Sequence, residues 1–293
     1  MTGTPLAVLS GAEPFAADGG RVGVLVSHGF TGSPASVRPW AQALADAGHT
    51  VRLPLLPGHG TSWEDANTTT WSDWYRAIEA SFDELRERCD QVFAFGLSLG
   101  GTLCLKLAEE RGDQVAGLTV VNPHLVNTRW DARFLLPVLR FAVSSWPAIG
   151  NDIKKEGMDE VAYDKTPVKA AWSAVQLGKT VKADLRKVTQ PLLVLGSRHD
   201  HLVDPVNVDL LLAGIGSQEV ERVTLEDSYH VATLDHDAHI IIERSLALID
   251  RVAGAATKPA PVKRTPAKSA AKRSQSKGKT QASASTTTAG DRT

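Results

Sequence analysis

Gln91-Val-Phe-Ala-Phe-Gly-Leu-Ser-Leu-Gly-Gly-Thr-Leu-Cys-Leu-Lys-Leu-Ala108 is the stretch that decides the fold. An apolar run typical of a buried strand leads directly into a helical pattern, and Ser98 lies at the junction between Gly96 and Gly100. Such a sharp turn imposes strained backbone dihedral angles on the serine, and the two glycines leave room for strand and helix to approach. The stretch therefore predicts a strand–turn–helix unit that holds the Ser98 hydroxyl at the carboxyl end of a sheet.

Short apolar runs alternate with helical stretches on both sides of this unit. We predict strands at Val22–Ser27, Thr50–Leu53, Gln91–Phe95, Val115–Val121, Pro191–Gly196 and Val220–Leu225, and helices at Val37–Ala47, Trp71–Arg88, Leu99–Arg111 and Ala238–Val252. Strands that are apolar almost throughout and that alternate with helices predict a doubly wound, mostly parallel sheet covered on both faces. The fold class is therefore α/β.

One interval interrupts this alternation. About 70 residues between Val121 and Pro191 contain no convincing strand, which is far longer than an ordinary connection. Apolar side chains such as Phe141 and Trp146 suit either a small subdomain with its own core or a cap that also lines a pocket. We expect a helical cap over about residues 123–188, inserted before the strand Pro191–Gly196.

Ser98 can act as a nucleophile if a base takes its proton and an acid orients that base. In a doubly wound sheet these partners are expected on the loops after later strands, with the acid before the histidine. Asp200 follows the strand Pro191–Gly196, and His230 follows the strand Val220–Leu225. We therefore predict that Ser98, His230 and Asp200 form a nucleophile–base–acid triad.

Further residues compete for the acid and base roles. Asp204 is a second candidate for the acid, but it precedes Pro205 and can instead cap the following helix. The remaining histidines suit different positions: His28 and His59 brace glycine-rich turns, His199 and His201 flank the acid, and His49, His124, His236 and His239 lie at a strand edge, before the cap or in the closing helix. His230 is left as the base.

A developing oxyanion needs backbone donors aimed at one point. The N–H group of Leu99 is one candidate, because it lies at the start of the helix after Ser98, where the helix dipole favours negative charge. The loop after Val22–Ser27 offers the N–H group of Phe30 as the second. We predict Phe30 and Leu99 as the oxyanion hole, with an ordinary glycine turn as the alternative interpretation of the loop.

Composition limits the other function classes. The chain has 293 residues, of which 42% are hydrophobic, so one large α/β domain and a tail can be accommodated. The two cysteines, Cys89 and Cys104, both lie in helix-like segments, which disfavours a disulfide framework. No signal-peptide pattern and no apolar run of about 18 residues is present, and we expect a cytoplasmic protein.

The C-terminal region differs in charge from the rest of the chain. From Lys258 onward there are nine basic residues and one acidic residue, Asp291, so this region carries +8 of a chain whose net charge is -1. A Lys-, Ala-, Pro- and Ser-rich segment cannot offset its ordering entropy by burial, and we expect residues 254–293 to be disordered. The tail is either a solubilising appendage or a salt-sensitive contact for nucleic acid or an anionic membrane.

Five motifs together resemble a known family. They are His28-Gly-Phe-Thr-Gly-Ser-Pro34, Leu56-Pro-Gly-His-Gly60, Gly96-Leu-Ser-Leu-Gly-Gly101, Asp159-Glu-Val-Ala-Tyr-Asp-Lys-Thr-Pro167 and Asp227-Ser-Tyr-His-Val-Ala-Thr-Leu-Asp235. They resemble the α/β-hydrolase esterases, and more closely the bacterial monoacylglycerol lipases and small carboxylesterases. The resemblance covers about residues 20–252 and implies an α/β-hydrolase domain over residues 1–253. Leu99 stands where this family often has Met, which leaves its backbone role unaffected.

The resemblance implies the same triad and oxyanion donors, and we expect a serine esterase that needs no cofactor and no metal. Monoacylglycerols or short-to-medium acyl esters are the expected substrates. Glu160 falls where the monoacylglycerol lipases place a glutamate that meets the glycerol hydroxyls, and a solvated surface charge is the alternative. The same triad also serves acyl transfer and carbon–carbon bond hydrolysis. From a different class, the domain could be an inactive scaffold whose basic tail binds nucleic acid or membrane.

Overall fold

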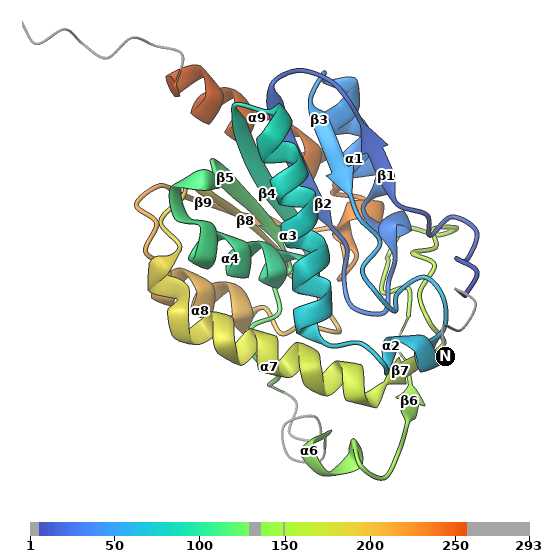
Figure 1. Ribbon diagram of the computed structural model, residues 1–293. Helices are drawn as coiled ribbons and strands as arrows, with labels where there is room; N and C mark the ends of the chain where they lie inside the picture. The colour runs from blue at the N-terminus through green and yellow to red at the C-terminus, as the bar shows by residue number, and fades with distance from the viewer. Residues whose placement is uncertain (1–5, 129–135, 149, 257–293) are drawn as a thin grey trace, which may run out of the picture. The chain divides into compact units, whose positions relative to one another are not determined.

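The computed structural model describes residues 6–128, 136–148 and 150–256. A seven-stranded sheet lies at its centre (Figure 1). In spatial order the strands are β1 (Phe15–Ala17), β3 (Thr50–Leu53), β2 (Val22–Ser27), β4 (Gln91–Leu97), β5 (Gly117–Val121), β8 (Leu192–Ser197) and β9 (Val220–Leu225). β1 pairs antiparallel with β3, and the other pairs of this sheet are parallel. The predicted α/β class with a mostly parallel sheet is confirmed.

The strand order reverses at β2, which lies between β3 and β4. In open α/β sheets, ligands bind outside the carboxyl ends of the strands at such a reversal, because the loops on either side diverge there. Ser27 at the end of β2 is in register with Gly96 of β4. The loops that begin at His28 and Ser98 therefore leave the sheet side by side.

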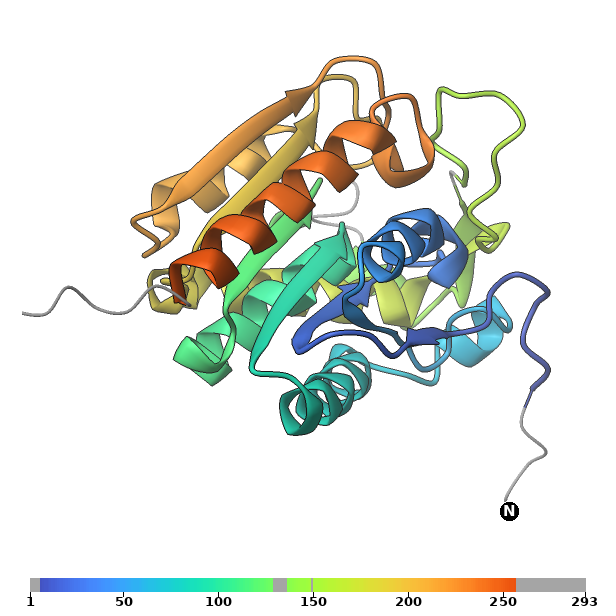
Figure 2. The same cartoon turned by 90° about the horizontal axis from the view of Figure 1, so that it is seen from above.

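Helices cover both faces of the sheet (Figures 1 and 2). The helices are α3 (Trp71–Arg88), α4 (Leu99–Arg111) and α8 (Val206–Gly214) on one face, and α1 (Arg38–Asp46) and α9 (Ala238–Ala256) on the other. Within β2, Leu25 packs into the core beneath α3, α4 and α8, whereas Val24 and Val26 pack into the core beneath α1 and α9. Burial on both faces is the reason that β2 is apolar almost throughout.

α3 shows how the sequence sets a helix. Its buried side chains Trp74, Ile78 and Phe82 recur every four residues and face the core. At the start, the backbone N–H of Thr70 donates to the carboxylate of Asp73 at 2.8 Å, which satisfies an amide that the helix itself leaves open. Both predicted limits of this helix are confirmed.

Among the described residues, the insertion between β5 and β8 contains two helices and two strands. They are α6 (Leu136–Leu139), β6 (Ser145–Pro147), β7 (Lys165–Pro167) and α7 (Val168–Asp184), and β6 and β7 form an antiparallel two-stranded sheet. The sequence pattern shows no convincing strand in this interval, and the helical cap that it predicts also contains this short two-stranded sheet. Strands of three residues are too short to produce a recognisable period-two pattern.

Smaller differences concern element limits. β4 continues to Leu97, β5 begins at Gly117, β8 ends at Ser197, and α9 continues to Ala256 rather than ending at Val252. The short elements missed in the sequence are β1, α2 (Trp63–Ala66), α8 and the 3-10 turns Pro34–Ser36, Gly112–Gln114, Leu185–Lys187 and Ala232–Leu234. Of the predicted disordered tail, residues 254–256 belong to α9, so the expectation of disorder was wrong for them. The rest of the tail, from residue 257, and residues 129–135 and 149 of the predicted cap lie outside the described residues. In the described part of the chain, no helix has both the length and the apolar character to cross a membrane.

Candidate active site

Ser98 occupies the turn between β4 and α4 in a conformation that L residues rarely adopt. Its φ and ψ are 53° and -117°, and its backbone N–H donates to Val121 O of the neighbouring strand at 2.8 Å. A Cβ on Gly96 would lie 2.4 Å from the backbone of Gly100, and a Cβ on Gly100 would lie 2.3 Å from Ser27 O. The predicted close approach of strand and helix is therefore present, and both glycines are required by it.

Asp200 and His230 meet beyond the ends of β8 and β9. Asp200 Oδ2 lies 2.7 Å from His230 Nδ1, and the two side chains are 2% and 8% exposed. The other carboxylate oxygen, Oδ1, accepts the backbone N–H groups of Leu202 at 2.8 Å and Val203 at 2.7 Å. The carboxylate is thus fully hydrogen-bonded on one side and directed at the imidazole on the other, which fixes the ring and leaves Nε2 free for a proton transfer.

The surroundings of His230 favour its charged form. Burial disfavours the imidazolium, but the charge of Asp200 and its hydrogen bond outweigh burial and raise the pKa of His230 above its ordinary value. The carboxylates of Glu160 and Asp152 add to this effect. A histidine in this environment can hold the proton that it takes from a serine hydroxyl.

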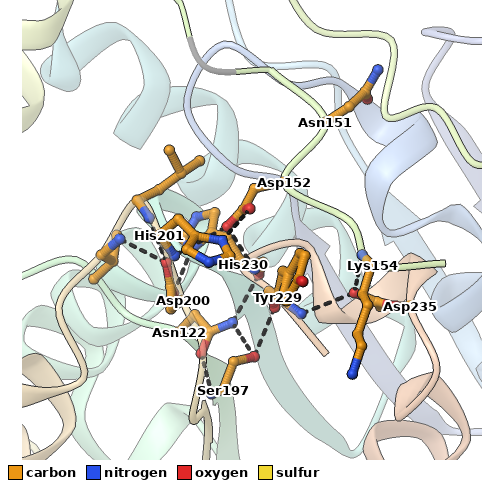
Figure 3. Close-up of polar contacts among 12 residues, drawn as sticks. Asn122, Asn151, Asp152, Lys154, Ser197, Asp200, His201, Tyr229, His230 and Asp235 are labelled. Atoms are coloured by element: carbon orange, nitrogen blue, oxygen red, sulfur yellow. Dashed lines mark hydrogen bonds and ion pairs between the residues drawn. The ribbon is translucent and has the colours of Figure 1, made fainter. Parts of the chain in front are cut away.

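A buried amide supports the histidine from the sheet side. Asn122, directly after β5, donates from Nδ2 to His230 O at 2.7 Å and to Ser197 Oγ at 3.0 Å. Its Oδ1 accepts the N–H of Ser197 at 2.7 Å, and Ser197 Oγ in turn donates to Tyr229 O at 2.7 Å. The carboxyl ends of β5 and β8 are thereby connected to the loop that carries His230 (Figure 3).

Ser98 and His230 line one cavity of about 400 Å³. The predicted oxyanion residues Phe30 and Leu99 line it too, and across the described residues neither backbone N–H is engaged by a hydrogen-bond acceptor. Much of the remaining wall is apolar and comes from the insertion, including Leu136, Leu139, Trp146 and Val168. The insertion therefore lines the same cavity as the serine, in agreement with the cap that the sequence predicts.

Two polar side chains lie near this cavity, His124 half-buried and Glu160 buried. His124 lines the cavity, and burial lowers its pKa to about 4, so the ring is neutral. Glu160 is buried next to the oxyanion loop, where its Oε2 lies 3.0 Å from the position that a Cβ on Gly32 would take. Burial raises the pKa of Glu160, although the backbone N–H of Asn151, 3.0 Å from Oε1, opposes this. Glu160 is therefore not a solvated surface charge.

The competing residues have contacts of their own. His28 accepts the N–H of Leu56 at Nε2 (3.2 Å), and His59 Nδ1 lies 3.2 Å from Pro57 O, so both brace turns as predicted. Asp204 accepts the N–H of Val206 at 2.9 Å, at the start of α8. Asp200 and not Asp204 contacts the imidazole of His230. Among the described residues, no group of three or more His, Cys, Asp or Glu side chains could hold a metal ion.

Comparison with known proteins assigns the chain to a family. The Hydrolase_4 model, described as serine aminopeptidase, S33, matches residues 20–237. The chain belongs to this family. It is an α/β-hydrolase serine esterase, as the motifs predict.

The serine esterase also resembles two curated enzymes. It is 44% identical over 254 residues to the thermostable monoacylglycerol lipase of Bacillus sp. (strain H-257), a match that covers 84% of this chain and 98% of the lipase. It is 27% identical over 236 residues to a carboxylesterase of Bacillus subtilis (strain 168), covering 78% and 92% of the two chains. The expected carboxylic ester hydrolase activity is therefore confirmed.

Solved structures agree on the architecture. A structure described with the metagenome-derived lipolytic enzymes LipS and LipT matches the serine esterase with a TM-score of 0.81 and 46% identity, over 84% of this chain and 100% of that one. The monoacylglycerol lipase of Paleococcus ferrophilus matches with a TM-score of 0.68 at 18% identity, over 81% and 99% of the two chains. The second similarity shows the shared fold alone.

Three residues of the site were missed in the sequence: Asn122, Ser197 and Asp152. Asn122 and Ser197 lie at or directly after the carboxyl ends of β5 and β8, and that position was a usable signal. Asp152 lies in an irregular segment of the insertion and contacts residues 49 and 78 positions further along the chain. Nothing local in the sequence marks it.

Proposed function

We propose that this esterase hydrolyses monoacylglycerols, with Ser98 as nucleophile, His230 as general base and acid, and Asp200 as the orienting carboxylate. The observation that supports this most is the 2.7 Å contact between Asp200 and His230 at the rim of the cavity that contains the Ser98 turn. Ser98 Oγ attacks the ester carbonyl while His230 takes its proton. His230 then protonates the departing glycerol, and water cleaves the acyl-enzyme by the same route.

The oxyanion of each tetrahedral intermediate is bound by the N–H groups of Phe30 and Leu99. Both residues line the cavity beside Ser98, and Leu99 is the first residue of α4, so the helix dipole adds positive potential there. Loss of one such donor typically costs about 3 kcal/mol of transition-state stabilisation. Two preorganised donors therefore account for a large share of the rate acceleration.

The two ends of a monoacylglycerol suit different parts of the site. The apolar wall formed by the insertion accepts the acyl chain, and Glu160, buried beside Gly32 of the oxyanion loop, accepts hydrogen bonds from the glycerol hydroxyls. The similarity to a monoacylglycerol lipase over 84% of the chain supports the same assignment.

The nucleophile is tested by covalent labelling. A fluorophosphonate probe labels the wild type, and Ser98→Ala abolishes labelling and ester hydrolysis because no other hydroxyl lies at the turn after β4. Ser81→Ala, on α3 away from the cavity, retains both. Stoichiometric labelling that survives in Ser98→Ala contradicts the assignment.

The alcohol site is tested by substrate discrimination. Glu160→Gln removes a charged acceptor, so kcat/KM for monoacylglycerol falls about 10- to 100-fold relative to kcat/KM for the methyl ester of the same fatty acid. We expect the wild type to hydrolyse triacylglycerols more slowly than monoacylglycerols, because a triacylglycerol has no free hydroxyl to donate to Glu160. Glu156→Gln, an exposed residue of the same segment, leaves the ratio unchanged. An unchanged ratio in Glu160→Gln removes Glu160 from the alcohol site.

We also propose that residues 254–293 are a basic appendage to the hydrolase domain and contact an anionic partner, nucleic acid or a membrane surface. The charge of +8 from Lys258 onward supports this, because each Lys or Arg that neutralises a phosphate releases counterions. We further propose a cytoplasmic location, which the two free cysteines, Cys89 and Cys104, support.

A further inference from the structure

Asp152 is a buried carboxylate that belongs to the insertion but packs against the two loops of the proposed acid and base (Figure 3). It lies between β6 and Glu160 in the chain and is 8% exposed. An ionised group in such a position is costly unless hydrogen bonds replace its hydration. Its partners therefore indicate what it does.

Every polar contact of Asp152 leads to the catalytic loops. Its Oδ2 accepts the backbone N–H of His230 at 3.1 Å and that of His201 at 3.2 Å. Its Oδ1 lies 2.7 Å from His201 Nδ1. Its backbone carbonyl accepts the N–H of Val231 at 3.1 Å. One residue of the insertion thus holds the loop after β8 and the loop after β9 together.

His230 is consequently fixed at three points. Asp152 takes its backbone N–H, Asn122 donates to its backbone carbonyl at 2.7 Å, and Asp200 contacts the ring. The first of these comes from the insertion and the second from the end of the central sheet. The backbone of a catalytic histidine is therefore clamped from two opposite sides by buried side chains.

The neighbouring residue makes a second connection. The backbone N–H of Asn151 donates to Glu160 Oε1 at 3.0 Å, and Asn151 Oδ1 accepts the backbone N–H of Glu160 at 2.9 Å. Two consecutive residues thus hold the proposed alcohol-binding carboxylate and the proposed base.

We propose that Asp152 is a positioning residue that fixes the His230 backbone relative to Asp200, and that the Asn151-Asp152 pair couples His230 to Glu160. This inference rests on the proposed function, since it assigns a partner to the base of that mechanism. A carboxylate suits the task because one oxygen accepts both backbone N–H groups, the other contacts the His201 ring, and the negative charge strengthens all three contacts. Misplacement of a catalytic group by about 1 Å can cost about 100-fold in rate.

Asp152→Asn is the decisive variant. It removes the negative charge that strengthens the contacts to both loops and leaves a single oxygen to accept the N–H groups of His230 and His201, so kcat falls about 10- to 100-fold while KM changes less than about threefold. The acidic limb of the kcat/KM profile also moves to lower pH, because one negative charge near His230 is lost. The charged or titratable groups that act on this ring are Asp200, Glu160 and Asp152, together with the neutral His124. Rates are taken per active site titrated with a fluorophosphonate, so a fall in folded protein does not imitate the effect.

Three further variants separate the possible outcomes. Glu156→Gln removes a charge from the same segment without touching the loops and retains wild-type kcat and pH profile. His201→Gln removes the ring contact but leaves both backbone N–H donors on Asp152, and its loss of kcat is smaller than that of Asp152→Asn. Asp152→Glu keeps the charge and shifts the carboxylate, so kcat falls while the acidic limb stays in place. If Asp152→Asn does not fold, Asp152→Glu serves as the test of the positioning role.

A wild-type kcat and an unchanged acidic limb in Asp152→Asn overturn the positioning role. Wild-type kcat in Asp152→Glu overturns it equally. Residual hydrolysis in Ser98→Ala has a different meaning, because it overturns the proposed function itself. The two failures are therefore distinguishable within one set of variants.

Discussion

Glu109 of α4 is a carboxyl group that burial and charge pull in opposite directions. Its side chain is 1% exposed, Oε2 lies 3.4 Å from Lys106 Nζ, and Oε1 has no hydrogen-bond partner in the described structure. Burial raises the pKa of Glu109 from 4.5 to about 7, although Lys106 opposes this. Between these two pH values the folded protein holds a proton that the unfolded chain has released.

Glu109 therefore makes stability pH-dependent with a defined sign. Because its pKa is raised by folding, its contribution is complete below about pH 4.5 and is lost as the pH rises through about 7. Glu109→Gln replaces the carboxyl by a permanently neutral group. We expect urea unfolding to show equal stability of variant and wild type at about pH 4.5, and a more stable variant at about pH 8.

The next residue provides a control of opposite sign. Burial of Glu110 is outweighed by hydrogen bonds from Tyr75 and Lys106, so its pKa is lowered. Its contribution is present at neutral pH and is lost as the pH falls through the lowered pKa. Glu110→Gln is consequently less stable than wild type at neutral pH, and the difference shrinks on acidification. A Glu109→Gln variant that behaves like Glu110→Gln contradicts the sign given to Glu109.

The sequence is informative about residues whose role follows from their local pattern. The position of Ser98 in a strand–helix turn could be predicted because two glycines flank it, and the positions of Asp200 and His230 because each follows a predicted strand. Asn122 and Asp152 act on the backbone of His230 across 108 and 78 residues of chain. The position of Asn122 after a predicted strand is a local signal, but its contact with His230, like that of Asp152, depends on how distant loops fold together.

Among the elements, α7 has an unusual start. It begins after Pro167 and has no capping side chain of its own. Instead Asn67, at the end of α2, accepts the N–H groups of Lys169 and Ala170 with Oδ1 at 2.9 and 3.4 Å. The Nδ2 group of Asn67 donates to Ser144 O at 2.7 Å. A single side chain from outside the insertion thus holds α7 and the residue before β6.

Replacement of Asn67 tests this external cap. Asn67→Ala leaves the first amides of α7 without their acceptor, and we expect a loss of about 1 kcal/mol in the free energy of unfolding. Asn67→Asp loses the bond to Ser144 O but keeps the acceptor for α7 and places a negative charge at its N-terminus, so its loss is smaller than that of Asn67→Ala. Thermal and urea unfolding measure both. Equal losses for the two variants contradict a capping role.

How well an element could be predicted depends on whether its pattern is complete within the element. The limits of α3 follow from apolar side chains that recur every four residues and from Asp73, which caps its first turn. The limits of β2 follow from a continuous run of buried residues. α7 and the β6–β7 pair were not predicted individually. The start of α7 is capped by Asn67, and β6 is stabilised by its pairing with β7. The residues that define these elements therefore lie in other parts of the chain.

At the scale of the whole molecule, charge is divided unequally along the chain. Removal of residues 257–293 takes away the nine basic residues and Asp291, and changes the net charge from -1 to about -9. We expect the truncated enzyme to keep its kcat on a neutral ester, because the proposed triad and the cavity lie before residue 257. Full-length protein shifts a DNA duplex in a low-salt gel, and the truncated protein does not.

Salt provides the control for this prediction. Binding through phosphate contacts weakens steeply as salt concentration rises, whereas a specific hydrophobic contact does not. Equal DNA binding with and without residues 257–293 would falsify the role given to the tail. Vesicles with and without anionic lipid, mixed with the same two proteins, distinguish a membrane surface from nucleic acid.

The connection of Asn151 and Asp152 to the catalytic loops limits how this enzyme can be recombined with its relatives. In one kind of chimaera, the whole insertion between the end of β5 and the start of β8 is replaced by that of a relative. Such a chimaera loses the Asp152 acceptor for the His230 backbone N–H together with the original cavity wall. Transplantation that retains residues 151–160 keeps this support and exchanges the wall around Leu136, Leu139 and Trp146. Shuffled libraries with crossovers on either side of that ten-residue segment should therefore contain more active members than libraries that replace the insertion as one block.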